Sequence, residues 1–290
     1  MGKDVSLVIP VFNEEKNVIP LYHLIKENLK KLKLNYEIIF IDDGSKDKTF
    51  QELLEVKKNN KDLILIRLRK HFGKSAALDA GLKQSKGNII ITMDGDLQDD
   101  PSDIPRFLEK INHYDLVVGW RANRKDALSK KIVSKIFNYL TRILTGLKIH
   151  DFNCGYKAYK RETIKDLGIY GELYRYIPAL LYWKGFSVTE IKVEHHYRKH
   201  GKSKYGAKRI FSGFLDLISI FFLMGYSKKP LHLFGGIGLV LLTIASIIAF
   251  YLLYLNLILE QSIIRPLLFL SVLLVILSIQ VFSIGLLGDM

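Results

Sequence analysis

Two carboxylates with a single residue between them, Asp94 and Asp96, directly follow the apolar run "IIITM" at residues 89–93. This spacing lets both side chains point into one space, and Gly95 between them lets a ligand approach the backbone. Clustered carboxylates repel unless a cation lies between them, and a divalent cation held by carboxylates usually binds substrate phosphates as well. With Gln98 as a further oxygen ligand, the stretch predicts a site for a divalent cation.

Three more acidic residues, Asp99, Asp100 and Asp103, follow in the same stretch. They lie at the start of a predicted helix at residues 101–112, whose positive end favours negative side chains. We therefore expect these three to cap the helix and not to bind a ligand.

Further polar and aromatic residues follow two other apolar runs, and a lysine begins a predicted helix. Phe12 offers a ring face to a nucleobase, and the polar groups of Asn13 and Glu14 suit a base or ribose. The carboxylates of the "DDGS" turn at residues 42–45 can accept hydrogen bonds from a base or a sugar hydroxyl. Lys74 stands at an expected helix N-terminus, a good position for contacting an anion. Each feature alone is typical of a turn or cap, but together they predict one ligand site.

Short apolar segments alternate with helical segments up to residue 120. Folding of these segments into one sheet with helices would bring the polar residues described above together. The predicted strands are rich in Val, Ile and Leu without polar alternation, as in parallel strands covered on both faces, and span residues 5–12, 36–44, 62–68, 88–96 and 115–120. Helical spacing of apolar residues predicts helices at 15–32, 46–59, 74–85 and 101–112. This alternation predicts a doubly wound, Rossmann-like α/β domain whose ligand lies beyond the carboxyl ends of the strands.

Two uncharged apolar stretches near the C-terminus, at residues 231–255 and 266–288, each exceed the ~20 residues that a helix needs to cross a bilayer. We expect both to be transmembrane helices. Basic residues precede the first stretch, whereas the join carries only Glu260 and Arg265. The positive-inside rule therefore places the N-terminal domain in the cytoplasm, in a multi-pass protein of the cell membrane or of an ER-type membrane.

Two amphipathic helices are expected to lie in the membrane interface, at about residues 127–147 and 208–229. The first has an apolar stripe with lysines beside it, and the second is apolar but interrupted by Asp216. The predicted organisation is a cytoplasmic α/β domain with the first amphipathic helix, then the second helix, then a transmembrane hairpin, at residues 1–207, 208–229 and 230–290.

The formal charge of +14 suits an anionic membrane face, a phosphorylated ligand or nucleic acid. The basic residues gather around the membrane-facing segments and are not interleaved with stacking aromatics, so we expect no nucleic-acid partner. Cys154 is the only cysteine, which excludes an internal disulfide and argues against a structural zinc site.

Five motifs in fixed order carry a resemblance to a known family: "SLVIPVFNEEKNV", "IIFIDDGSKDKT", "HFGKSAALDAG", "TMDGDLQDDP" and "CGYKAYKR". The chain resembles the inverting family 2 glycosyltransferases of the GT-A fold, and within them the polyprenyl-phosphate sugar synthases. The resemblance covers nearly the whole chain, including the paired C-terminal spans. It implies transfer of a hexose from a nucleotide sugar, of the UDP-glucose or GDP-mannose type, to dolichyl or undecaprenyl phosphate with the help of Mg²⁺ or Mn²⁺.

The resemblance also implies roles for individual residues. Asp94 and Asp96 match the metal and donor motif, with Gln98 a further metal ligand, and Arg121 matches an arginine near the acceptor phosphate. We expect the nucleotide-sugar contacts to include Pro10, Phe12, Asn13, Glu14, Ile41, Asp43, Lys74, Gly95, Arg198, Ser203 and Lys204. We expect the acceptor phosphate to lie near Arg121, Lys131, Lys135, Asp151 and Lys157.

Two residues depart from the family pattern: Lys157 stands where many members have Arg, and Cys154 where many have Ser. Lys cannot make the bidentate fork to phosphate that Arg makes, which weakens an acceptor contact there. A processive polysaccharide synthase is one alternative, but its Gln-x-x-Arg-Trp element is absent. A catalytically inactive, membrane-anchored scaffold that binds nucleotide sugars is another. The sequence leaves open the base, the sugar and the formation of a homo-oligomer.

Overall fold

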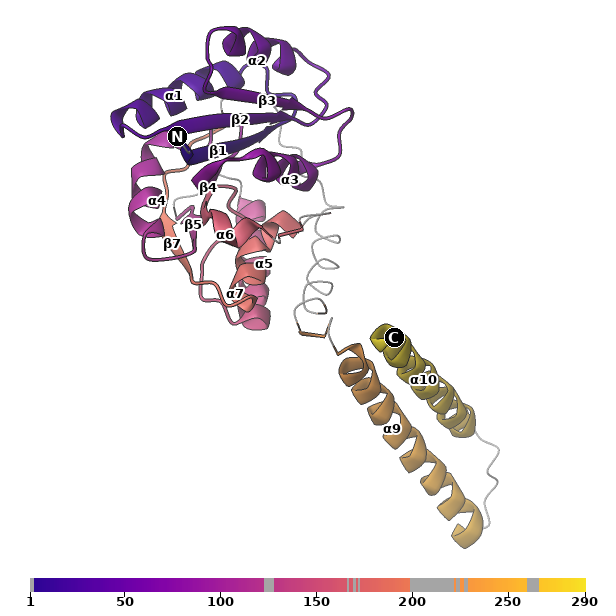
Figure 1. The fold of residues 1–290 in the computed structure, drawn as a ribbon. Helices are drawn as coiled ribbons and strands as arrows, with labels where there is room; N and C mark the ends of the chain where they lie inside the picture. The colour runs from indigo at the N-terminus through magenta and orange to yellow at the C-terminus, as the bar shows by residue number, and fades with distance from the viewer. Residues whose placement is uncertain are drawn as a thin grey trace. The chain divides into compact units, whose positions relative to one another are not determined.

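The structure is a computed structural model that describes residues 3–122, 128–165, 167–168, 171, 173–198, 222, 225–226, 229–259 and 266–290, without the side chains of residues 128–133. The chain divides into two compact units, Met1–Leu217 and Ile218–Met290. The first is an α/β unit built on one sheet, and the second contains a pair of long helices (Figure 1).

The sheet has seven strands in the order β3-β2-β1-β4-β6-β5-β7. All of the predicted strands are present, as β1 (Lys3–Val11), β2 (Tyr36–Asp42), β3 (Leu63–Arg67), β4 (Gly87–Thr92) and β5 (Leu116–Trp120). The sequence prediction lacked two strands, β6 (Lys157–Lys160) and β7 (Val188–Lys192). The α/β class is confirmed, but the sheet is mixed, because β6 runs antiparallel to both of its neighbours.

The first helices cover both faces of the parallel half of the sheet. Figure 1 shows α1 (Val18–Lys31) and α2 (Thr49–Lys58) on one side of the strands and α3 (Lys74–Gln84) on the other. Right-handed crossovers require this, because the chain moves outward from β1 to β3 and then returns across β1 to β4. The interior strand residues are fully buried; Leu7, Ile39 and Ile91 are examples.

The antiparallel strand β6 determines where the site can form. The carboxyl ends of β1, β2, β4 and β5 lie at one edge of the sheet, and an antiparallel strand between β4 and β5 begins at that same edge. Lys157, the first residue of β6, is accordingly in register with Thr92 of β4 and Val118 of β5. The segment that leads into β6 therefore lies beside the residues that follow β4.

Shorter elements complete the first unit: η1 (Pro101–Asp103), α4 (Ile104–Ile111), α5 (Leu128–Thr145), α6 (Arg161–Ile164), η2 (Leu173–Arg175) and α7 (Ile177–Trp183). The helix α5 falls inside the predicted range of 127–147. Its described part leaves large apolar side chains exposed, including Ile136, Tyr139 and Ile143.

In the second unit, α9 (Pro230–Leu259) and α10 (Pro266–Asp289) are long and apolar enough to cross a membrane, by length and composition. Both predicted spans fall within them. The helices pack against each other through small residues: Ser278 Oγ donates to the Gly238 carbonyl at 2.8 Å and Ser271 Oγ to the Ala245 carbonyl at 3.0 Å. Most of the helix predicted at residues 208–229 lies outside the described residues.

Candidate active site

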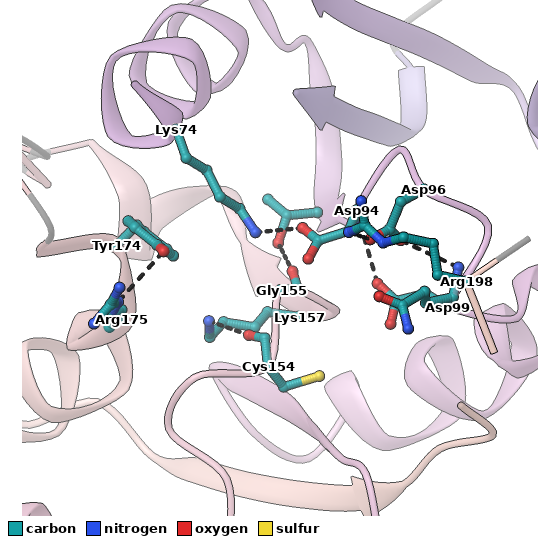
Figure 2. Close-up of polar contacts among 12 residues, drawn as sticks. Lys74, Asp94, Asp96, Asp99, Cys154, Gly155, Lys157, Tyr174, Arg175 and Arg198 are labelled. Carbon is teal, nitrogen blue, oxygen red and sulfur yellow. Dashed lines mark hydrogen bonds and ion pairs between the residues drawn. The ribbon is translucent and has the colours of Figure 1, made fainter. Parts of the chain in front are cut away.

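Asp94 and Asp96 lie at the carboxyl end of β4, and each is paired with a cation from a distant segment (Figure 2). Lys74, the first residue of α3, forms an ion pair with Asp94. Arg198 forms an ion pair with Asp96. Arg198 reaches this position because residues 193–196 run beside the strand ends, where His196 N–H donates to the Gln98 carbonyl at 2.9 Å. The fold thus brings together four of the predicted site residues.

Two glycines make room for this arrangement. A Cβ on Gly155 would lie 2.4 Å from Asp94 Oδ1, so the carboxylate occupies space that only glycine leaves open. A Cβ on Gly95 would lie 2.5 Å from Val11 Cγ1. Gly95 therefore allows the turn after β4 to pack on β1, a reason different from the ligand approach that the sequence suggested.

Asp99 also belongs to the cluster, so its assignment to the helix cap was wrong. It is buried, and its carboxylate accepts the N–H of Asp94 at 3.1 Å. Asp100 is the cap, because its side chain accepts the Ser102 N–H at 2.8 Å. The other expected cap, Asp103, makes no side-chain capping bond to α4 and instead pairs with Arg106 at 2.6 Å.

The three neighbouring carboxylates perturb one another. Burial, and then the charge of Asp94, raise the pKa of Asp96 to about 6 and the pKa of Asp99 to about 7. Burial alone would raise the pKa of Asp94 too, but the ammonium group of Lys74 lowers it below its usual value. The cluster therefore holds more negative charge than its burial favours, which is the condition that a bound cation relieves.

This donor chemistry fits Mg²⁺ or Mn²⁺. Within the described residues, no group of three or more His, Cys, Asp and Glu side chains is arranged to hold a metal. Mg²⁺, however, is commonly held by one or two carboxylates, with substrate phosphates and water completing its shell. Asp94 and Asp96 supply two such carboxylates. The Gln98 side chain donates from Nε2 to the His196 carbonyl at 3.3 Å. Its amide oxygen can therefore serve as a metal ligand.

A second cluster lies at the ends of β1 and β2, where the nucleoside contacts were predicted. Phe12 stacks on His71 with ring centroids 3.9 Å apart. The Asp43 carboxylate accepts the N–H groups of Phe72 at 2.8 Å and Gly73 at 2.9 Å and lies 2.7 Å from His71 Nδ1. His71 was not predicted; its position two residues before the glycine of "HFGK" is its only signal. A hollow of about 390 Å³ adjoins this cluster, lined by Gly44, Ser45, Arg67, Leu68 and Arg69.

Other predicted nucleotide contacts have internal partners. Asn13 Oδ1 accepts the Lys46 N–H at 2.8 Å, and Glu14 accepts from Asn17 Nδ2 at 2.6 Å while lying 3.7 Å from Arg198. Pro10 of β1 is in register with Ile41 of β2. The Ile41 side chain is fully buried, which leaves that residue a supporting role.

The predicted acceptor residues divide into three groups. Arg121 and Asp151 form a buried, bidentate ion pair, and Lys157 is buried close by. Burial lowers the pKa of Lys157 to about 8, and the nearby Lys74 lowers it as well. Lys135 is exposed on α5. The Lys131 side chain lies outside the described residues, as do the predicted nucleotide-sugar contacts Ser203 and Lys204.

Comparison with known proteins agrees with this geometry. Residues 6–168 match the family described as Glycosyl transferase family 2. The chain belongs to that family. It is 40% identical over 99% of its length to a dodecaprenyl-phosphate galacturonate synthase of Rhizobium johnstonii, and covers 87% of that protein. It is 34% identical over 87% of its length to an undecaprenyl-phosphate 4-deoxy-4-formamido-L-arabinose transferase of Pseudomonas fluorescens, and covers 73% of it. The predicted resemblance is confirmed, and this protein is a glycosyltransferase.

Solved structures support the fold of this family 2 glycosyltransferase. A glucosyl-3-phosphoglycerate synthase from Mycobacterium tuberculosis, solved with Mn²⁺ and UDP-glucose, superposes with a TM-score of 0.58. It is 17% identical, and the match covers 77% of this chain and 79% of that one. The α/β sheet of our protein is therefore of the GT-A type.

Proposed function

We propose that this glycosyltransferase moves a sugar from a nucleotide sugar to a polyprenyl phosphate. The observation that carries the proposal is the placement of Asp94 and Asp96, which face Lys74 and Arg198 at the carboxyl edge of the sheet. Such a cluster suits a diphosphate and a divalent cation. The relatives, similar along most of the chain, supply the acceptor class, because both are named for a polyprenyl phosphate.

The chain's own groups would bind the diphosphate as follows. Asp94 and Asp96 would hold Mg²⁺ or Mn²⁺, which when bound neutralises charge on the leaving nucleoside diphosphate. Lys74, at the N-terminus of α3, and Arg198 would then turn from their carboxylates to the phosphate oxygens. Phe12 and Asp43 would hold the base and ribose beside the hollow at Gly44. Ser203 and Lys204 remain predicted contacts.

The acceptor needs no general base. A phosphate monoester has a second pKa of about 6, so its oxygen is largely ionised at neutral pH and can attack the anomeric carbon directly. Asp151 is engaged by Arg121 on both oxygens, which suits a positioning residue and not a proton acceptor. We infer that this pair shapes the acceptor side and that Lys157 contributes charge there.

The identity of the sugar is the open part of the proposal. The relatives are named for galacturonate and for 4-deoxy-4-formamido-L-arabinose, whereas the sequence alone suggested a hexose such as glucose or mannose. The donor series must therefore include uronic acids and amino-pentoses beside the neutral hexoses.

We further propose that the first unit rests on the membrane in which α9 and α10 are embedded. Two elements contribute to one exposed apolar surface, because Trp183 Nε1 of α7 donates to the Thr145 carbonyl of α5 at 3.3 Å. We call this surface the α5–α7 face; its exposed side chains are Ile136, Tyr139, Leu140, Ile143, Leu144, Tyr182 and Trp183. A mixture of aliphatic and aromatic side chains with Lys135 nearby suits the boundary between headgroups and acyl chains. We also propose the orientation that the sequence predicts, in which the first unit lies in the cytoplasm.

The test is a transfer assay with the full chain purified in detergent. Undecaprenyl phosphate and Mg²⁺ or Mn²⁺ are supplied with labelled UDP-glucose, GDP-mannose, UDP-galacturonate and a UDP-amino-pentose, and the lipid fraction is examined. We expect labelled lipid with at least one donor and none after chelation of the metal. Donor binding without labelled lipid across the series would favour the inactive scaffold. A labelled polymer would favour a polysaccharide synthase.

A further inference from the structure

The His71 side chain makes both of the contacts that were predicted for the nucleobase. Its ring stacks on Phe12 with centroids 3.9 Å apart and an angle of 14° between the planes. Its Nδ1 lies 2.7 Å from Oδ2 of Asp43. The sequence predicted that a base stacks on Phe12 and that Asp43 accepts hydrogen bonds from a base or a sugar hydroxyl. A ring of the protein therefore stands where a ring of the ligand is expected.

The stack leaves no room for a base between the two rings. Nearly parallel rings with centroids 3.9 Å apart are already in van der Waals contact, so a third ring cannot enter between them. A base that binds to this face of Phe12 must therefore replace the His71 ring. The same replacement frees the Asp43 oxygen that His71 contacts.

The His71 ring can leave while the backbone around it stays in place. The next two residues are anchored, because Asp43 accepts the N–H groups of Phe72 at 2.8 Å and Gly73 at 2.9 Å. Gly44 packs against the chain from the other side, where a Cβ would lie 2.8 Å from the His71 backbone nitrogen. The His71 side chain, in contrast, is 54% exposed, so rotation about its Cα–Cβ bond can carry the ring towards solvent.

The Asp43 carboxylate is held ready for a ligand by these same backbone contacts. Only 4% of its side chain is exposed, and the two N–H groups fix its orientation whether or not His71 is beside it. A carboxylate has acceptor sites for about four hydrogen bonds, so it can accept a further one from a base or a ribose. The hollow of about 390 Å³ at Gly44 gives the ligand room beside this cluster.

We propose that His71 competes with the nucleobase of the sugar donor for Phe12 and Asp43, and that donor binding displaces its ring into solvent. This inference rests on the proposed function, which requires a nucleotide at this cluster. Because the base forms its contacts only after those of His71 are broken, His71 lowers the affinity for the nucleotide. A base stacked on the outer face of His71 would have the opposite effect, since His71 would then add to the affinity.

The first test measures binding of UDP, GDP and pyrophosphate to the full chain in detergent with Mn²⁺. His71→Ala should bind the preferred nucleotide about 2- to 10-fold more tightly than wild type, the range for removing one competing aromatic pair. Pyrophosphate has no base, so its affinity should not change. His71→Phe keeps a ring on Phe12 and should gain less than His71→Ala. The matched control is His113→Ala, because His113 is exposed and precedes β5 at the opposite edge of the sheet.

The second test follows the His71 ring in the wild-type protein. Diethyl pyrocarbonate acylates accessible imidazole rings, and mass spectrometry of the peptides gives the rate at each histidine. The preferred nucleotide with Mn²⁺ should increase the rate at His71 relative to the rate at His113. A base stacked over His71 would instead protect it. Protection or an unchanged rate at His71, or weaker nucleotide binding by His71→Ala, would overturn the inference.

Failure of the proposed function would give a different set of results. If neither UDP nor GDP binds to wild type or to His71→Ala, the nucleotide-sugar donor is refuted, and the role of His71 with it. If His71→Ala gains affinity for a nucleotide but no donor yields labelled lipid in the transfer assay, the proposed function fails and the competition at Phe12 stands. If transfer occurs and His71→Ala gains no affinity, only the role of His71 is refuted.

Discussion

Arg121 donates two hydrogen bonds to Asp151, from Nε to Oδ2 at 2.7 Å and from Nη2 to Oδ1 at 3.1 Å, with about a tenth or less of either side chain exposed. Burial alone would lower the pKa of Arg121, but the Asp151 carboxylate raises it well above its usual value. The guanidinium group therefore stays charged, and its partner is the carboxylate beside it. This pair joins the end of β5 to the loop that precedes β6.

Removing one member of the pair should destabilise the protein strongly. Asp151→Asn leaves Arg121 buried and uncompensated, which typically costs about 3–5 kcal/mol. Thermal unfolding in detergent should show a large fall in the midpoint. The double variant Arg121→Met/Asp151→Leu should recover much of that loss, because no lone charge remains. If Asp151→Asn unfolds at the wild-type temperature while transfer is lost, the pair acts on substrate and not on structure.

Gly155→Ala should abolish transfer with a small effect on folding. The added Cβ would meet Asp94 Oδ1 at 2.4 Å, so the carboxylate must leave the position from which it would hold a metal. We expect transfer to fall at least about 100-fold, comparable to losing one well-placed electrostatic contact. Gly168→Ala is the matched control, because a Cβ there meets nothing within 4 Å. Equal activity of the two variants would contradict the assignment of Asp94.

The sequence predicted the half of the site that follows the parallel strands. Apolar runs define β1, β2 and β4, and the rule that ligands bind at the carboxyl edge brings Asp43 and Asp94 to one edge. That rule also placed Lys74 correctly, because α3 begins at the same edge. The family resemblance suggested Arg198 as a pyrophosphate contact, but its pairing with Asp96, 102 residues away, was not predicted.

The other half of the site depends on features that local patterns do not encode. The strand β6 is four residues long and begins and ends with lysine, so no apolar run marks it. Without β6, nothing in the sequence places Lys157 between β4 and β5. Asp99 looked like a cap because two other acidic residues follow it, and only the folded turn shows its bond to Asp94.

Asp99 should make the metal-free protein less stable as the pH rises. Its folded pKa is about 7 against an ordinary value of 3.8, so the folded state binds more protons between these values and stability falls as the pH rises through them. Other carboxylates also make stability depend on pH, so the Asp99→Asn variant is compared with wild type at each pH. With EDTA present, the unfolding midpoint of Asp99→Asn minus that of wild type should grow from pH 5 to pH 8.

Mn²⁺ should offset the loss of stability at high pH, because a cation at Asp94 and Asp96 compensates the negative charge of the crowded carboxylates. We expect Mn²⁺ to raise the wild-type midpoint more at pH 8 than at pH 6, since protons compete with the metal for Asp96, whose pKa is about 6. Asp96→Asn should bind Mn²⁺ more weakly and lose transfer, with its membrane insertion unchanged. A Mn²⁺ response that is independent of pH would argue against these ligands.

The α5–α7 face can be tested by site-specific spin labelling in liposomes. Cys154 is buried, and burial raises the pKa of its thiol to about 12, so it should not react with a label at neutral pH. A label at Ile143→Cys or Trp183→Cys should therefore report on one position only. If this face lies at the boundary of headgroups and acyl chains, both labels should be accessible to oxygen and shielded from a water-soluble nickel complex.

A control label and one charged variant complete the membrane prediction. Lys58 on α2 has a side chain that is 66% exposed, so Lys58→Cys should be open to the nickel complex in liposomes and in detergent alike. Ile143→Glu places a charge on the face and should raise the KM for undecaprenyl phosphate while leaving donor binding unchanged, because the site then lies less favourably against the lipid. Labels at Ile143 and Lys58 with the same accessibility would show that the first unit stands clear of the bilayer. In that case the lipid phosphate must reach the site without help from α5 and α7.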